Sequence, residues 1–287
     1  MQLTDLSSRV IPATEYRRER WRNQLGWTRE ILCLGDADQW ALRLSIAEIE
    51  QDAAFSAFPG IDRELVLLRG NGMRLQFGNG NGDGNGEADI DPGISANANS
   101  PDAETETIAA AAAGKSGGPD TLGAESICER AGVSGAWSTA ADARAWPWAP
   151  HLVANPARSG HCVDLMPPYQ RVRFAGEDAV HAVLLDGATQ DFNLMWRRDL
   201  LQTELLHRPL VGTMVFFADP GSAWAIHLLA GQARFGRDSD LPPLVAGDTA
   251  WLSAAARTRY VLDGGGELLA IRVSLIAETI NLPGIAG

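Results

Sequence analysis

Asp191 and Asn193 are the polar residues whose type and spacing most clearly suggest chemistry in this chain. They follow an apolar run that ends at the turn Asp186-Gly187, and apolar residues alternate with them. Residues two apart on a strand point to the same face, so the aspartate and the asparagine face one way while their apolar neighbours face a core. The polar side meets either bulk water or a wet pocket, and both interpretations are open at this point.

Arg43 is a second candidate, because small residues flank it on one face of a predicted strand. Trp40, Leu42, Leu44 and Ile46 take one face of this strand, and Ala41, Arg43, Ser45 and Ala47 take the other. Small residues beside an arginine suggest space, as in the lumen of a barrel, although an arginine on a strand is more often exposed. Arg43 or Arg63 could hold a carboxylate through two parallel hydrogen bonds.

The histidines do not favour a metal site. His151, His161, His181, His207 and His227 show no His-x-His spacing, and His227 is interpreted as a hydrogen-bonded core residue. The sequence also lacks a nucleophile elbow, a P-loop and a dinucleotide-binding fingerprint. His181 and Asp186 could be forced into an acid–base pair, but their spacing does not support one. We therefore predict no catalytic residue, no metal and no cofactor.

Composition narrows the classes of partner. The net charge is −12, but residues 78–126 hold nine acidic residues and one lysine, which is −8 of that total. Nucleic-acid binding needs a basic face, so it is not expected. No apolar stretch approaches membrane-spanning length, and no signal peptide is apparent. The scattered Cys33, Cys128 and Cys162 are interpreted as reduced thiols. These features predict a cytoplasmic protein without membrane contact.

The elements that must position these residues are strands. Short apolar runs separated by glycine, proline and aspartate predict an all-β fold without a long amphipathic helix. Residues 64–69 and 73–77, around Gly70-Asn71-Gly72, predict a hairpin. Residues 201–210 are predicted to be a connection. Exposed sheet edges in such a fold would also allow a homodimer.

Residues 78–160 differ in character from the rest. Gly-Asn repeats and a polyalanine run precede Ser126, with few large apolar residues and no aromatic one. Such a segment cannot bury enough apolar area to offset its ordering entropy, so we predict a low-complexity, disordered insertion. Trp137, Trp146 and Trp148 are expected to dock on the body of the protein, or otherwise to bind a partner.

Three matches in the same order indicate an internal repeat. Residues 67–70 match 228–231, residues 174–177 match 245–248, and residues 183–187 match 260–264. With the insertion set aside, the two copies have similar length. Two copies of one β unit follow from this pattern.

The repeat resembles the order of elements in a cupin, and the whole chain resembles the HutD/Ves family. The residues that carry this likeness are Trp21, Asn23, Gly26, Thr28, Arg29, Glu30, Ile31, Arg43 to Ala47, Phe55, Ser56, Phe58, Pro59, Gly60, Asp62, Arg63, Phe174, Gly176, Leu185 to Gly187, and Asp191 to Met195. The resemblance implies a bicupin, in which two cupin (jelly-roll) β-barrel repeats follow each other and the first carries the insertion. We therefore predict a first repeat in residues 1–77 and 161–200, the insertion in 78–160, and a second repeat in 201–287.

The sequence departs from the family at the start of its first motif. The family pattern there is Trp-Lys-Asn followed by glycines, whereas this chain has Arg22 and then Gln24 and Leu25. Arginine changes the donor geometry that lysine would offer. The two larger residues stiffen and crowd the loop, which affects the family's ligand contacts near it.

The resemblance implies a non-enzymatic regulator associated with histidine utilisation, which binds a small carboxylate such as urocanate or N-formylglutamate. The ligand-binding residues predicted for a metal-free pocket are Trp21, Asn23, Thr28, Glu30, Arg43, Ser45, Phe58, Arg63, Asp191 and Asn193. The structural alternative is that Arg63 and Asp62 form a surface ion pair, while Asp191 and Asn193 only brace the turn. The functional alternatives are a Ves-like stress-induced protein and a metal-free, isomerase-like cupin enzyme acting on a sugar or small acid.

Overall fold

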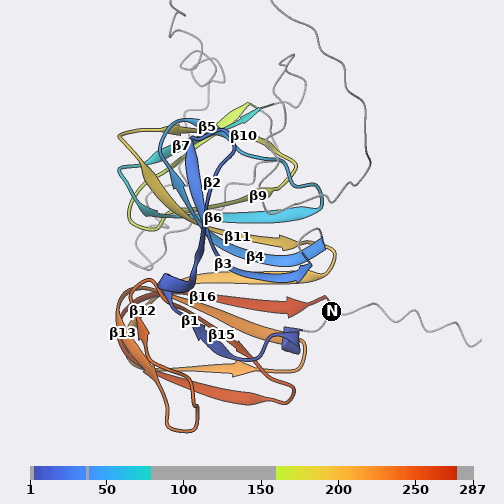
Figure 1. Ribbon diagram of the computed structural model, residues 1–287, viewed down its shortest axis with the longest axis vertical. Coiled ribbons are helices and arrows are strands. Elements are labelled where there is room, and N and C mark those ends of the chain that lie inside the picture. The colour runs from blue at the N-terminus through green and yellow to red at the C-terminus, as the bar shows by residue number, and fades with distance from the viewer. Residues whose placement is uncertain (1–2, 37–38, 79–159, 277–287) are drawn as a thin grey trace, which may run out of the picture.

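A computed structural model describes residues 3–36, 39–78 and 160–276, and it confirms the predicted all-β class. Its sheets form three layers along the long axis, with the sheet that contains Asp191 in the middle (Figure 1). The middle sheet has the order β2 (Arg17–Arg20), β3 (Gly26–Asp36), β4 (Gln39–Ile49), β11 (Thr189–Arg197), β6 (Ile61–Arg69) and β9 (Arg171–Ala175).

The other two sheets cover the two faces of the middle one (Figure 1). The smaller has the order β5 (Ala53–Ala54), β10 (Ala179–Leu184), β7 (Met73–Gly78) and β8 (His161–Leu165). The C-terminal sheet has the order β1 (Arg9–Ile11), β15 (Thr249–Ser253), β13 (Ser222–Phe235), β16 (Thr258–Leu275) and β12 (Leu201–Ala218), and β14 (Leu244–Val245) pairs with β13. Two 3-10 turns, η1 (Leu3–Asp5) and η2 (Ala13–Glu15), flank β1. The first strand of the chain therefore belongs to the C-terminal sheet.

Both faces of the middle sheet are buried, which explains the composition of β4. Leu42 and Leu44 join Phe192 and Leu194 in a core cluster that also contains Trp251 of the C-terminal sheet. Alternate residues of β4 point the other way, toward the smaller sheet. A second cluster fills part of that inner space. The rest of the inner space holds polar side chains.

The predicted hairpin around Gly70-Asn71-Gly72 is wrong. The strands before and after it, β6 and β7, lie in different sheets, so this turn is a crossover between layers. Leu67 and Met73 are buried in the same core cluster between the two sheets. Local alternation predicts both strands, but it does not predict that they pack face to face instead of pairing edge to edge.

The predicted connection at 201–210 is also wrong. These residues begin β12, which pairs with β16 along its whole length. Leu201 and Leu205 are buried, whereas Glu204 between them is not part of the core. Pro209 within this stretch breaks the sequence pattern, but β12 is an edge strand, where a residue without a backbone donor is tolerated.

The second match of the internal repeat corresponds to two turns of the same construction. Asp178 Oδ2 accepts a hydrogen bond from the backbone N–H of Ala175 at 3.0 Å, and Asp248 Oδ2 accepts one from Val245 at 3.0 Å. These aspartates are equivalent, so the correct alignment is shifted by one residue from the sequence match. The third match aligns residues at the end of β10 with residues inside β16. These two segments do not hold equivalent positions in the fold.

The insertion, with its tryptophans, lies outside the described residues apart from Gly78 and Gly160. Cys33 is free, whereas Cys162 is disulfide-bonded, so the prediction of three reduced thiols is wrong. Sequence spacing does not show which sulfur atoms meet in space, and the cysteines therefore do not favour a cytoplasmic location.

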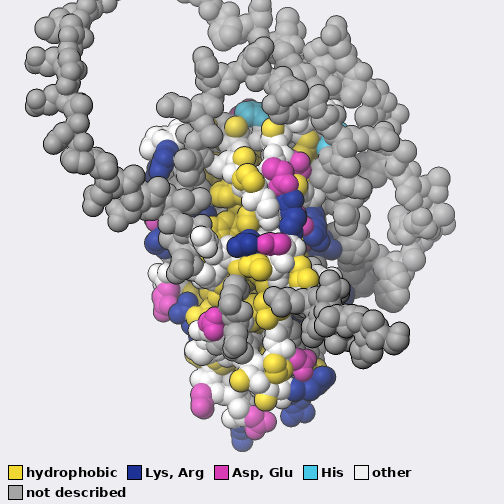
Figure 2. All heavy atoms as spheres, turned by 90° about the vertical axis from the view of Figure 1, so that its right-hand side faces the viewer, with side chains coloured by type: hydrophobic (Ala, Val, Ile, Leu, Met, Phe, Trp, Pro, Cys, Tyr) yellow, Lys and Arg dark blue, Asp and Glu magenta, His cyan; other side chains and the backbone are white. Residues whose placement is uncertain are grey.

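In the described part of the chain, no helix is long and apolar enough to cross a membrane. Figure 2 shows acidic and basic side chains intermixed on one face of the described residues.

Candidate functional site

Strand pairing places the candidate residues in three rows across the inner face of the middle sheet. Thr28 pairs with Ala47, and Ala47 with Asp191. Glu30 pairs with Ser45, and Ser45 with Asn193. Arg43 pairs with Met195, and Met195 with Arg63. Because paired residues on neighbouring strands share a face, the three rows are adjacent.

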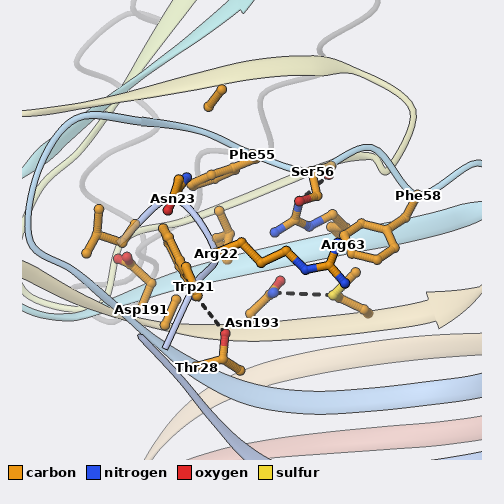
Figure 3. A pocket seen from close by; sticks show the side chains of 15 residues that line it. Trp21, Arg22, Asn23, Thr28, Phe55, Ser56, Phe58, Arg63, Asp191 and Asn193 are labelled. Carbon is orange, nitrogen blue, oxygen red and sulfur yellow. Dashed lines mark hydrogen bonds between the residues drawn. The ribbon is translucent and has the colours of Figure 1, made fainter. Parts of the chain in front are cut away.

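A cavity opens over four strands of the middle sheet, β3, β4, β11 and β6, and over the loops above them (Figure 3). Seven of the ten predicted binding residues line it: Trp21, Asn23, Thr28, Phe58, Arg63, Asp191 and Asn193. The remaining lining residues are Arg22, Ala47, Ile49, Ala54, Phe55, Ser56, Leu65 and Met195. The polar face of β11 therefore meets a cavity inside the protein and not bulk water. Whether these residues bind a ligand remains a prediction.

Glu30, Arg43 and Ser45 are not among the lining residues. Arg43 is 3% exposed, and its Nε donates a hydrogen bond to Glu30 Oε2 at 2.9 Å. Glu30 also lies 3.4 Å from a guanidinium nitrogen of Arg17. The buried guanidinium of Arg43 is thus held by a carboxylate of the protein, beside the cavity but not in its wall.

Arg63 is buried under aromatic rings and does not form the surface ion pair with Asp62 that was the structural alternative to a role in the pocket. Its guanidinium carbon lies 5.1 Å from the ring centres of both Phe55 and Phe174. Its Nη1 donates a long hydrogen bond, 3.5 Å, to the carbonyl oxygen of Ser56. Asp62 instead pairs with Arg173 and Arg198. Aromatic faces thus hold this guanidinium at the cavity wall, and a guanidinium is a group that recognises anions by charge-assisted hydrogen bonds.

The loop at residues 21–25 forms one wall of the cavity. Trp21 Nε1 donates a hydrogen bond to Thr28 Oγ1 at 2.9 Å, which fixes the indole ring. Asn23 Oδ1 accepts a hydrogen bond from the backbone of Leu25 at 3.0 Å. Gln24 has a φ of 62°, in the left-handed region that favours glycine. This explains why the family pattern has glycines here, and it shows that this chain keeps the turn with a larger residue.

Arg22 was recognised in the sequence as a departure from the family pattern, but not as a site residue. Its side chain extends from the loop into the cavity (Figure 3), although it remains exposed to solvent. It forms no hydrogen bond or ion pair with any other described residue. The charge of Arg22 is therefore available to a bound anion. Its position directly after Trp21 was the signal that could have identified it.

Asp191 has a strongly perturbed pKa. Its side chain is 0% exposed, and burial raises the pKa of this carboxyl group from 3.8 to about 8, against the opposing effect of a hydrogen bond from Thr189. The Thr189 hydroxyl donates to Oδ2 at 3.3 Å. Strongly perturbed carboxyl groups in cavities are typical of functional sites.

Asn193 lies two residues further along β11 on the same face. Its Nδ2 donates a hydrogen bond to the sulfur of Met195 at 3.3 Å. Among the described residues, neither Asn193 Oδ1 nor Asp191 Oδ1 has a hydrogen-bond partner. Buried polar atoms without partners are costly, so such atoms at a cavity wall are candidate ligand contacts.

No group of three or more histidine, cysteine, aspartate or glutamate side chains in the described ranges could hold a metal ion. His227 is a core residue, as predicted. It is 2% exposed, its Nδ1 hydrogen-bonds with Thr249 Oγ1 at 2.9 Å, and its ring lies 5.2 Å from that of Phe192. Burial lowers the pKa of His227 from 6.5 to about 4, so it is neutral at physiological pH.

The fold and cavity define an all-β protein with a polar, arginine-containing pocket over the inner face of its middle sheet. The chain belongs to the HutD family, whose model matches residues 13–92 and 155–270. This confirms the resemblance to the HutD/Ves family.

Similar proteins agree with this assignment. An uncharacterised 21.2 kDa protein of the hutC 3' region of Pseudomonas putida is 43% identical over 68 residues, which cover 23% of this chain and 36% of that protein. Protein Ves of Citrobacter koseri is 44% identical over 57 residues, which cover 20% of this chain and 30% of Ves. The aligned part thus spans about a third of the length of these curated relatives.

Two solved structures share the fold. A conserved protein of unknown function from Pseudomonas aeruginosa has a TM-score of 0.59 and 19% identity, covering 94% of this chain and 99% of that one. HutD from Pseudomonas fluorescens has a TM-score of 0.57 and 18% identity, covering 94% of this chain and 100% of that one.

Proposed function

We propose that this chain is a non-enzymatic regulator associated with histidine utilisation, which binds a small carboxylate such as urocanate or N-formylglutamate in a metal-free cupin pocket. Membership of the HutD family supports the association, as does similarity to a protein of the hutC 3' region. The observation that carries the binding proposal is that Arg22 and Arg63 both line one cavity with aromatic walls. Guanidinium groups recognise carboxylates by paired, charge-assisted hydrogen bonds.

The pocket belongs to the first of two cupin repeats in this proposal. The two equivalent turns at Asp178 and Asp248 support a repeated unit, and the layered sheets are compatible with two barrels sharing a central core. The carboxylate is assigned to Arg22 and Arg63, because both line the cavity, whereas Arg43 lies outside its wall and is bonded to Glu30. The aromatic rings of Trp21 and Phe58 would cover the apolar part of the ligand.

The test is calorimetric titration of the full chain with urocanate and, separately, with N-formylglutamate, followed by chemical analysis of each ligand. Saturable heat with unchanged ligand is expected for at least one compound. A charge-assisted hydrogen bond contributes about 1.5–3 kcal/mol, so Arg22→Ala and Arg63→Ala should each weaken binding by roughly 10- to 100-fold. Arg237→Ala, at an exposed turn outside this cavity, is the matched control. Absence of heat from both compounds would refute the proposal.

An enzyme is the second candidate, and Asp191 is the observation that favours it. A buried carboxyl group with a pKa of about 8 is suited to proton transfer near neutral pH. A metal-free, isomerase-like cupin acting on a sugar or small acid would consume its ligand during the titration. Altered ligand after the titration would therefore move the protein to this class. A stress-induced role like that suggested for Ves proteins would leave both candidate ligands unbound.

The protein is proposed to act as a cytoplasmic homodimer. The edge strand β12 pairs on one side only and carries Val211, which is 89% exposed. Long edge strands can pair with a second copy of the same chain. Light scattering of the purified chain would measure its oligomeric state.

A further inference from the structure

Two buried oxygen atoms in the cavity wall have no partner in the described part of the chain: Asp191 Oδ1 and Asn193 Oδ1. Their side chains are 0% and 8% exposed, and both line the cavity. They are two residues apart on one strand and face the same way, so one small group can reach both. Native proteins rarely leave two neighbouring buried polar atoms without partners, which indicates that a ligand completes them.

Asp191 lies at the end of the cavity away from Arg63, and Asn193 lies between them along β11. Arg63 pairs with Met195, four residues along β11 from Asp191, which corresponds to roughly 13 Å at about 3.3 Å per residue. Figure 3 shows Asp191 and Arg63 on opposite sides of Trp21. The pairing register shifts between Gln190 and Asp191, as in a β-bulge, and such irregularities re-aim side chains at sites. The cavity therefore has a guanidinium end and an aspartate end, with Asn193 between them.

Charge on Asp191 has no compensation at its own end. The charged or titratable residues on the elements packed against it are Glu48 and Arg43 on β4, Asp62, Arg63, Glu64 and Arg69 on β6, Arg22 in the 21–25 loop, and Arg74 on β7 and His181 on β10 of the smaller sheet. None of these described groups forms an ion pair or hydrogen bond with Asp191. Its contact is the Thr189 hydroxyl, which donates to Oδ2. A buried carboxyl group in such surroundings holds its proton. Because Oδ2 is the accepting atom, the proton belongs on Oδ1.

We infer that Asp191 is a specificity residue that donates a hydrogen bond from Oδ1, as a neutral carboxylic acid, while Asn193 Oδ1 accepts one beside it. Together they select ligands whose uncharged end both accepts and donates hydrogen bonds, such as an amide or an imidazole. A second carboxylate at this end is rejected, because it offers no donor to Asn193. This inference rests on the proposed function, since it assigns the other end of the same ligand.

The test compares each candidate ligand with an analogue that lacks the hydrogen-bonding end. Cinnamate replaces the imidazole of urocanate by a phenyl ring, and glutarate lacks the formamide of N-formylglutamate. The wild-type protein is expected to bind its ligand at least 10-fold more tightly than the analogue. Asp191→Ala should abolish this preference, whereas the amide of Asp191→Asn can still donate and should preserve most of it. Asp186→Asn, at an exposed turn, is the control.

The pH profile adds a readout that a purely structural role would not change. With N-formylglutamate, which has no group that titrates in this range, wild-type affinity should be constant from about pH 6 to 7.5 and then fall toward 10-fold per pH unit above the pKa of Asp191. Asp191→Asn, which cannot ionise, should bind with the same affinity throughout and fold as the wild type does. Ligand binding that is independent of pH up to 9.5, or an unchanged preference in Asp191→Ala, would overturn this inference and leave the proposed function standing. Absence of any binding to the wild-type protein would refute both.

Discussion

Asp191→Asn should stabilise the ligand-free protein near neutral pH, although it alters a fully buried side chain. The folded pKa is about 8, whereas the ordinary value is 3.8. Between these values the folded protein holds one proton that the unfolded chain releases. The free energy of unfolding must therefore fall as pH rises through this interval and become constant above about pH 8. Asparagine has nearly the same shape and no ionisable proton, so it removes this penalty.

The magnitude follows from the linkage slope. One linked proton changes the free energy of unfolding by about 1.4 kcal/mol per pH unit. The stability of Asp191→Asn relative to wild type should therefore increase by roughly 3 kcal/mol between pH 5 and pH 7. The new amide donor lacks a fixed partner, which costs about 1–3 kcal/mol at every pH. The variant should consequently be less stable than wild type near pH 4 and more stable at pH 8.

Urea denaturation of both proteins at several pH values from 4 to 9 measures this difference. Only the difference between the curves matters, because other titrating groups affect both proteins equally. Asp186→Asn, which changes an exposed aspartate, should show no such slope. A difference between Asp191→Asn and wild type that stays constant within about 0.5 kcal/mol would show that Asp191 ionises in the folded protein as it does in the unfolded chain.

Three further outcomes are expected. A Cβ at Gly26 would lie 2.5 Å from the carbonyl oxygen of Glu48 and 3.0 Å from the Trp21 ring. Gly26→Ala should therefore lower the free energy of unfolding by about 1–3 kcal/mol, measured by urea denaturation. A variant as stable as the wild type would show that the loop moves to accommodate the methyl group. His227 has a folded pKa of about 4 and an ordinary value of 6.5, so the stability that depends on it is complete above pH 6.5 and is lost as pH falls toward 4. His227→Gln should remove this part of the pH dependence of the free energy of unfolding. The same loss of stability in acid for the variant and the wild type would contradict the low pKa of His227. Glu30→Gln weakens the Glu30–Arg43 pair, which lies outside the cavity wall. It should lower the free energy of unfolding by about 1–3 kcal/mol but change ligand affinity, measured by calorimetry, less than 3-fold. A larger loss of affinity would place Glu30 in the binding site.

Local patterns predict most of the strands correctly because alternation reflects burial on two faces. The alternation in residues 40–47 predicts β4, and the alternation after Gly187 predicts β11. The hairpin at Gly70-Asn71-Gly72 fails for a physical reason. Two apolar strands joined by a short glycine turn can either pair by backbone hydrogen bonds or pack face to face in two layers. The choice depends on which other strands occupy their edges.

The sequence by itself determined the all-β class, the family and the polar face of β11. These features follow from residue types at short spacing and from motifs that lie close together in the chain. Tertiary structure decided what that polar face meets. β11 pairs with β4 and β6, which lie more than a hundred residues earlier in the chain. This pairing makes the side chains of Asp191 and Asn193 face the cavity. Only there does desolvation change the protonation of Asp191, and only there is Arg43 paired with Glu30 while Arg22 and Arg63 line the cavity. Burial and charge pairing depend on distances across the fold, which no local period in the sequence records.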